Sequence, residues 1–161
     1  MSIRLKFDYL KFPADPSKAF PGRRSATRPV IPVTLINGDK KVTNLAIIDS
    51  GADLCIFHAE IGEQIGIDIE SGKLQTFSGI TREQLTAYFH DIKIGIGGYE
   101  YNCYAGFSRD LVNMPYGLLG QGPHREARCD MGTCGTMARD AVELCAVGRN
   151  AERAGAIRRA A

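Results

Sequence analysis

The tripeptide Asp49-Ser50-Gly51 places a carboxylate, a hydroxyl and a glycine between two apolar runs, residues 45–48 and residues 54–57. A lone tripeptide of this kind is compatible with a simple turn, because Asp and Ser hydrogen-bond to nearby backbone and Gly allows positive φ. A turn on a solvated surface is rarely flanked by apolar stretches on both sides, however. A carboxylate held between two buried strands is costly unless it has a task or a partner. Asp49 is therefore the leading candidate for a functional residue.

Other chemistries have weaker support in the sequence. The three histidines are isolated from one another and are expected to be surface residues rather than ligands: His58, His90 and His124. Three late cysteines lack the close Cys-x-x-Cys pairs of zinc sites: Cys129, Cys134 and Cys145. Cys55 lies in an apolar run and is expected to be a small buried residue. No Ser-His-Asp grouping, phosphate loop or basic stripe is present, so we expect no metal and no cofactor.

The elements that must position Asp49 are short strands. Apolar and polar residues alternate over residues 3–9 and 92–105, and further short apolar stretches are separated by turn signals such as Asn37-Gly38 and Gly97-Gly98. The remaining strands are expected at residues 30–36, 42–48, 54–57, 67–69, 74–77 and 84–89. Pro32 should make the first of these an edge strand or interrupt its pairing. Residues 12–29 contain several prolines and predict a loop, and residues 58–65 predict a short helix that ends at Gly66. The expected fold class is all-β, a small closed barrel or sandwich with one short helix.

Over residues 28–122, this pattern resembles the retropepsin-like aspartic proteases. The stretch from Ala46 to Asp53 (AIIDSGAD) looks like the active-site strand and loop of that family. Phe77-Ser78-Gly79-Ile80 lies where the family has its flap, and Leu118-Leu119-Gly120 matches its hydrophobic-hydrophobic-Gly motif. The resemblance implies a small closed barrel and the hydrolysis of peptide bonds.

The chemistry of that family needs two carboxylates about 3 Å apart, which share one proton because both cannot ionise. One carboxylate activates a water, and the other donates to the scissile carbonyl. This sequence contains a single Asp-Ser-Gly and no Asp-Thr-Gly. The second carboxylate must therefore come from another copy of the chain, with a two-fold axis between the two Asp49 residues.

The resemblance also implies roles for the neighbouring residues. Ser50 would bond across the two-fold axis, and Gly51 would leave room for the substrate backbone. Asp53 would bind the substrate main chain, although a turn or ion-pair role is an equal alternative. The flap tip at Ser78, Gly79 and Ile80 would close over the peptide, with a plain hairpin turn as the alternative at Gly79. Four residues would support the active-site loop: Ala52, Leu118, Leu119 and Gly120.

The composition changes near residue 122. All thirteen aromatic residues precede it, whereas residues 123–161 are rich in Ala and Arg and contain no Lys. We therefore expect a protease domain at residues 1–122 and a tail at residues 123–161. The tail is expected to be irregular, with a short helix within residues 136–147 at most. It is either a natural disordered tail or the product of a frameshift, and the second is favoured because the family pattern stops at the same point.

Bulk composition excludes some partners. A net charge of +2 gives no case for nucleic acid or a membrane surface, and no apolar run is long enough to span a bilayer. Five cysteines at irregular spacing predict a reducing compartment, the cytoplasm. The expected function is an aspartic endopeptidase whose partners are a second copy and a peptide or protein substrate. The alternative is an inactive dimerisation or peptide-binding module that keeps the same fold.

Overall fold

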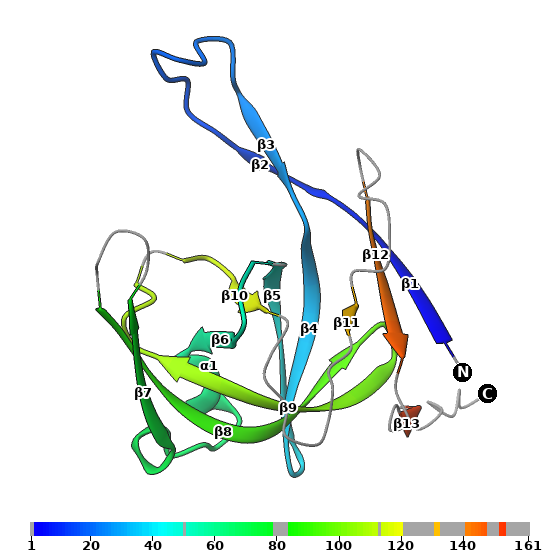
Figure 1. Cartoon of the computed structure of the whole chain (residues 1–161), viewed down its shortest axis with the longest axis vertical. Helices are drawn as coiled ribbons and strands as arrows, with labels where there is room; N and C mark the ends of the chain where they lie inside the picture. The colour runs from blue at the N-terminus through cyan, green and yellow to red at the C-terminus, as the bar shows by residue number, and fades with distance from the viewer. Residues whose placement is uncertain are drawn as a thin grey trace, which may run out of the picture.

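The structure is a computed structural model that describes residues 2–49, 51–78, 84–112, 114–120, 131–132, 141–147 and 152–153. Strands dominate these residues (Figure 1). Those that precede residue 122 are β1 (Ser2–Asp8), β2 (Leu10–Pro13), β3 (Ser25–Arg28), β4 (Val30–Asn37), β5 (Lys40–Ile48), β6 (Cys55–His58), β7 (Lys73–Ser78), β8 (Gln84–Ile96), β9 (Tyr99–Ser108) and β10 (Gly117–Leu119). Three more follow: β11 (Met131–Gly132), β12 (Ala141–Val147) and β13 (Glu152–Arg153). Two short helices, α1 (Ala59–Gln64) and the 3-10 helix η1 (Ile69–Ser71), lie between β6 and β7.

Six of these strands close into one barrel in the order β9-β6-β10-β5-β4-β8, because β8 also pairs with β9. The interior is filled by apolar side chains that alternate along the strands. Phe57 and Phe107 are the largest fully buried side chains, and Ile31, Val33 and Leu35 line β4 at the same depth. The predicted all-β closed barrel with one short α-helix is therefore confirmed.

Two turns match their sequence signals closely. Gly97 and Gly98 join β8 to β9 with φ values of 58° and 85°, which glycine adopts without strain. In the β4–β5 hairpin Asn37 pairs with Lys40, so the two turn residues are Gly38 and Asp39, one position later than the Asn37-Gly38 signal suggests. Pro32 pairs with β5, but the pairing of β4 with β8 begins only at Thr34. Because proline lacks an N–H donor, it interrupts the second ladder as predicted.

The helix α1 confirms the predicted short helix. His58 caps it: its Nδ1 accepts a hydrogen bond from the Glu60 N–H at 3.2 Å. Gly66 follows the helix with φ of 78°. The strand expected at residues 67–69 is wrong. Ile69 begins η1 instead, and its buried side chain packs into the barrel core.

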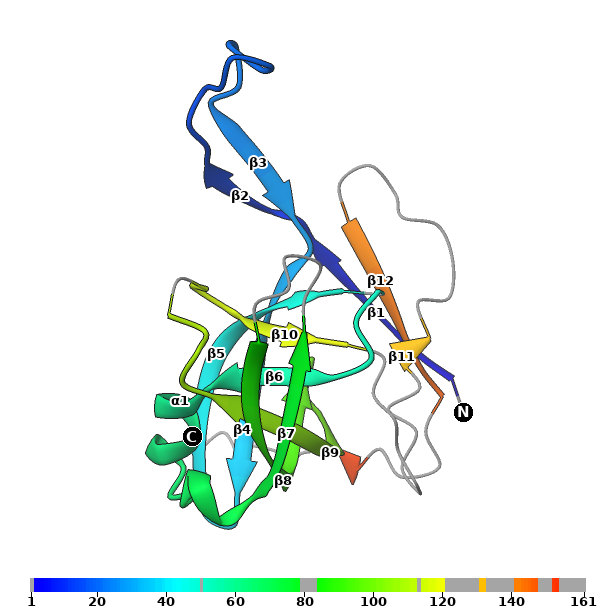
Figure 2. The same ribbon diagram turned by 60° about the vertical axis from the view of Figure 1, so that its left-hand side comes forward.

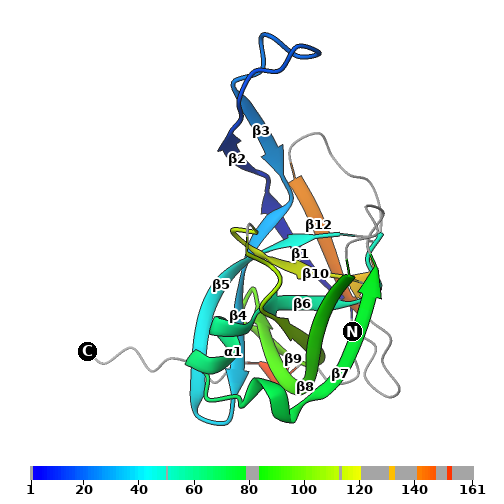
Figure 3. The same ribbon diagram turned by 90° about the vertical axis from the view of Figure 1, so that its left-hand side faces the viewer.

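The loop expected over residues 12–29 is also wrong in part. β2 and β3 pair as an antiparallel hairpin, with Leu10 opposite Arg28 and Pro13 opposite Ser25. The hairpin extends away from the barrel in all three views (Figures 1, 2 and 3). We call residues 10–28 the arm. The prolines in it lie at the end of β2 and in the connecting loop, where they do not break the ladder.

The tail contains a strand where a helix was expected. Within residues 136–147, the structure describes residues 141–147, and these form β12. β12 pairs antiparallel with β1 along seven positions, from Ser2 opposite Val147 to Asp8 opposite Ala141. β11 adds to the other side of β12, and β13 pairs with the start of β9. The division at residue 122 and the frameshift origin of the tail stay predictions.

No helix within the described part of the chain is long and apolar enough to cross a membrane.

Candidate active site

Asp49 lies immediately after β5, directly beyond the buried Ile48. β10 runs parallel beside β5, with Leu119 opposite Ile48. The Asp49 N–H donates to the Leu119 carbonyl at 2.9 Å, which extends this ladder by one residue. The side chain of Asp49 is exposed in the single chain. The sheet thus fixes the backbone of Asp49 while it presents the carboxylate outward.

A tight turn holds the carboxylate in one orientation. Its Oδ1 accepts the Gly51 N–H at 2.9 Å, and its own backbone carbonyl accepts the Ala52 N–H at 3.2 Å. This is an Asx-type turn, in which the side chain replaces a backbone acceptor. A Cβ on Gly51 would lie 3.3 Å from Oδ1, so glycine leaves the carboxylate unobstructed. Ser50 lies outside the described residues.

The residues behind the loop are packed closely, as the sequence motif predicts. Gly120 is buried, and a Cβ there would meet the carbonyl oxygens of Leu54 and Ala52 and the Leu54 nitrogen. Leu119 is 1 % exposed and joins the barrel core, whereas Leu118 is half-buried in a second apolar cluster with Ile56. The structure therefore brings Asp49, Gly51, Ala52, Leu119 and Gly120 together.

Two cysteines stand behind this packing. The Cys55 thiol donates to the Gly120 carbonyl at 3.6 Å. The Cys103 side chain hydrogen-bonds to Cys55, and this lowers the pKa of the Cys55 thiol although burial acts in the opposite direction. Both cysteines are buried thiols outside any disulfide, in agreement with the expectation that Cys55 is a small core residue. They contribute packing and hydrogen bonds, not reactive surface groups.

Of the predicted flap residues, Ser78 ends β7 in the β7–β8 hairpin. β7 pairs with β8 from Lys73 opposite Phe89 to Ser78 opposite Gln84. Gly79 and Ile80 follow Ser78 and lie outside the described residues, so their predicted contact with a peptide stays a prediction. Asp53, the other predicted substrate-binding residue, is exposed on the loop before β6.

Two residues that no sequence motif marked hold β8 at Thr86, which lies opposite Thr76 in the middle of this hairpin. Ser108 is the buried polar residue of the described chain, with 1 % exposure. Its Oγ donates to the Thr86 carbonyl at 2.6 Å and accepts the Asp110 N–H at 3.1 Å. Asp110 Oδ2 in turn accepts the Thr86 N–H at 2.8 Å. Both backbone groups of Thr86 are thus held by the last residue of β9 and by Asp110 just after it. No motif marks this clamp, since its residues are 22 and 24 positions from Thr86.

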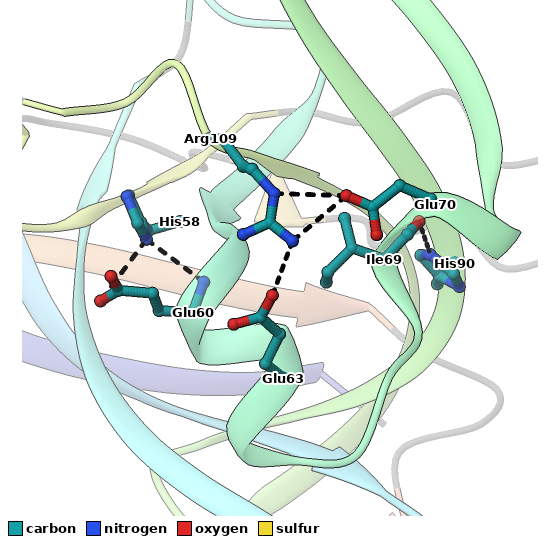
Figure 4. A network of polar contacts seen from close by, with 7 residues as sticks. All are labelled: His58, Glu60, Glu63, Ile69, Glu70, His90 and Arg109. Atoms are coloured by element: carbon teal, nitrogen blue, oxygen red, sulfur yellow. Dashed lines mark hydrogen bonds and ion pairs between the residues drawn. The ribbon is translucent and has the colours of Figure 1, made fainter.

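A second polar network joins the helices to the same segment (Figure 4). The Arg109 guanidinium contacts Glu63 Oε1 at 2.7 Å and Glu70 Oε1 at 3.1 Å. The Glu70 N–H and the Arg109 guanidinium lower the pKa of the Glu70 carboxyl, in that order of effect, and the two glutamates raise the pKa of Arg109. All three side chains are about half-exposed, so solvent screens this network and we assign it a positioning role.

The described histidines have local structural roles. His58 caps α1, and His90 Nε2 lies 2.9 Å from the Ile69 carbonyl (Figure 4). Among the described residues, no group of three or more His, Cys, Asp or Glu side chains is arranged to hold a metal ion. His124, Cys129 and Cys134 lie outside those residues.

Comparison with known proteins gives one structural answer. No protein-family model matches the sequence, and no curated protein matches it. Among solved structures, the chain is similar to a retropepsin-like aspartic protease from Rickettsia conorii, with a TM-score of 0.51 and 16 % identity over 90 % of this chain and 94 % of that chain. A second similar structure is EIAV protease complexed with the inhibitor HBY-793, with a TM-score of 0.44 and 14 % identity over 58 % of this chain and 81 % of that chain.

Identities this low establish a fold and nothing more. The chain has the retropepsin-like fold. The similarity to the rickettsial structure covers 90 % of this chain, and residues 1–122 make up a smaller share of it than that. The similarity therefore extends past residue 122, near which the composition changes.

Proposed function

We propose that this chain is one half of a homodimeric aspartic endopeptidase, with Asp49 as its catalytic carboxylate. One observation carries the proposal: an exposed carboxylate directly follows a barrel strand, on a loop fixed by Leu119 and oriented by Gly51. A carboxylate fixed in this way is arranged in advance for acid–base work. The fold of the solved neighbours supports the same class of chemistry.

The reaction needs a second carboxylate opposite Asp49. Because Asp49 is exposed in the single chain, a second copy related by a two-fold axis can bring its own Asp49 to the same place. The two carboxylates then share one proton. The ionised one removes a proton from a water, which attacks the peptide carbonyl, and the protonated one donates to the carbonyl oxygen. Asp53 and the flap tip, with Ser78, Gly79 and Ile80, are proposed to hold the substrate backbone, and Ser50 to bond across the axis.

The direct test is Asp49→Asn. Asparagine keeps the shape of the loop but cannot act as a general base, so peptide cleavage should fall by at least about a hundredfold. The matched control is Asp39→Asn in the β4–β5 turn, which should leave cleavage unchanged. Cleavage should follow a bell-shaped pH profile that belongs to the carboxylate pair. Activity that survives Asp49→Asn, or that metal chelators remove, would contradict the proposal.

A second candidate function has one observation in its favour. β7 is the last strand of its sheet within the described residues, and Leu74 on it is 60 % exposed. An open edge of this kind can bind an extended peptide by strand addition without cleaving it. If wild-type protein binds a peptide and no cleavage is detected, and if Leu74→Pro removes the binding, the inactive peptide-binding module replaces the endopeptidase.

A further inference from the structure

The arm, residues 10–28, is a two-stranded hairpin that pairs with no further strand among the described residues. Its ladder continues beyond β2 and β3 through a hydrogen bond from the Ala14 N–H to the Arg24 carbonyl at 3.1 Å. At the tip, Ser17 and Phe20 exchange backbone hydrogen bonds of 3.1 and 3.3 Å, and the Arg24 guanidinium donates to the Pro21 carbonyl at 3.2 Å. These bonds hold Phe20 outward, with 61 % of its surface exposed. An ordered hairpin that presents a large aromatic side chain to solvent has the form of a binding element.

The arm is also the most basic part of the chain. It contains Lys11, Lys18, Arg23, Arg24 and Arg28 against Asp15, a formal net charge of +4, so the rest of the chain carries −2. Within the described structure, none of these five cations forms an ion pair. The arm thus presents positive charge that no ion pair within the described residues neutralises.

The base of the arm is fixed beside the catalytic loop. The carbonyl of Pro29, directly after β3, accepts the N–H of Ile48, directly before Asp49, at 2.9 Å. On the other leg, the Phe12 ring lies 5.9 Å from the ring of Tyr116, which directly precedes β10. From this base the arm leaves its own barrel (Figures 2 and 3). At ~3.3 Å per extended residue, each leg reaches out by roughly 25 Å.

We propose that the arm clasps the second copy of the chain, an inference that rests on the proposed homodimeric site. The two-fold axis of that site passes between the two Asp49 carboxylates, so each arm starts close to the axis and points away from its own barrel. Two arms that ran together along the axis would bring two +4 segments side by side, which like-charge repulsion disfavours. Crossing onto the other subunit instead places each basic arm on a body of opposite net charge. Phe20 then buries its ring against the partner.

The main variant replaces residues 15–23 with Asn-Gly. The new turn is flanked by Ala14 and Arg24, which already share a backbone hydrogen bond, so the variant keeps all four β2–β3 pairs and the Phe12–Tyr116 contact. It removes Phe20 and two of the arm cations, Lys18 and Arg23. A two-residue Asn-Gly turn closes such a hairpin without strain. The matched control is the double substitution Lys40→Glu and Lys41→Glu, on exposed positions at the β4–β5 turn, which Figure 1 shows at the other end of the barrel. Circular dichroism checks that both variants are folded.

Sedimentation equilibrium measures the dimer dissociation constant of each variant. The trimmed arm should raise the dimer dissociation constant by at least about tenfold, and the control should not. Added salt should weaken the wild-type dimer more than the trimmed one. A trimmed variant that dimerises as well as wild type, while wild type cleaves peptide, would overturn the clasp and leave the proposed function intact. A dimer that depends on the arm but does not cleave peptide would support the clasp and contradict the proposed function.

A photocrosslink tests the contact directly. With Phe20→p-benzoylphenylalanine in the full chain, irradiation of the dimer should give a product of twice the chain mass, which disappears on dilution to monomer. Products confined to one chain would mean that the arm folds back on its own barrel, and the proposal would be wrong.

Discussion

At the scale of single residues, the position of Asp49 depends on glycines that do no chemistry. Gly120 allows the end of β10 to press against the backbone of Ala52 and Leu54, and Gly117 does the same against the Phe57 ring. The Asp49 N–H reaches the Leu119 carbonyl only because β10 can approach so closely. The conformation of the loop that bears the Asp49 carboxylate therefore depends on close packing at Gly117 and Gly120 behind it.

This predicts a strong effect for Gly120→Ala. The added Cβ meets backbone atoms, which cannot rotate away as a side chain can, so we expect a loss of about 1–3 kcal/mol in the free energy of unfolding. Cleavage should fall as the Asp49 loop shifts. Urea denaturation measures the first effect, and a peptide assay under folding conditions measures the second.

Gly22→Ala is the matched control. A Cβ there has no atom within 4 Å, so stability should change by less than about 0.5 kcal/mol. If Gly120→Ala and Gly22→Ala lowered the free energy of unfolding equally, the close packing behind the Asp49 loop would not explain the effect of Gly120→Ala.

Residues could be predicted from the sequence where a local pattern marks them. Asp49, Gly51, Leu119 and Gly120 form short motifs, and the structure brings them together. Ser108 and Asp110 could not be found this way, because their partner Thr86 lies on another strand, and only the folded barrel brings the two together. Hydrogen bonds to distant backbone groups leave no repeat or spacing in a sequence.

At the scale of elements, the barrel strands, β1 and β7 followed from alternation and turn signals, whereas the arm and β12 did not. The prolines of the arm suggested a loop, yet all of them lie at the end of β2 or in the connection, where the ladder needs no N–H donor from them. Residues 136–147 had a composition suited to a helix. Pairing with β1 explains the strand there, because β1 has its own unpaired edge in the absence of β12. Tertiary pairing overrides weak local preference.

A truncation decides what the strand after residue 140 contributes. A chain that ends at residue 140 lacks β12, so β1 loses its seven-residue partner. We expect hydrogen exchange of the β1 amides to accelerate by at least about tenfold while β4 and β5 keep their protection. A chain that ends at residue 153 keeps β12 and serves as the control.

Unchanged exchange in β1 after the shorter truncation would show that β12 adds nothing in solution, as expected of a tail derived from a frameshift. Accelerated exchange would make residues 141–147 a working part of the fold. The coding sequence around residue 122, translated in all three frames, provides an independent answer.

At the scale of the whole molecule, the proposed second copy accounts for two features of the single chain together. Asp49 is exposed, where the proposed chemistry needs a second carboxylate, and the arm extends away from the barrel, where we propose that it covers the partner. The sequence predicts the first of these, since it contains one Asp-Ser-Gly. The second emerges only from the fold, because the charge of the arm is diluted in a chain of net +2.

A shared active site has a quantitative signature in mixtures of wild-type and Asp49→Asn chains. If each site takes one carboxylate from each of two chains, only wild-type dimers are active, and their fraction is the square of the wild-type fraction. With free exchange of subunits, equal amounts of the two chains should leave about a quarter of the wild-type activity at the same total protein. The assay measures peptide cleavage across mixing ratios after time for exchange. A linear decline with the mutant fraction would mean that each chain acts alone, and the two-fold site would be wrong. Asp39→Asn chains in the same mixtures should leave activity constant, because that substitution lies in the β4–β5 turn and not in the site.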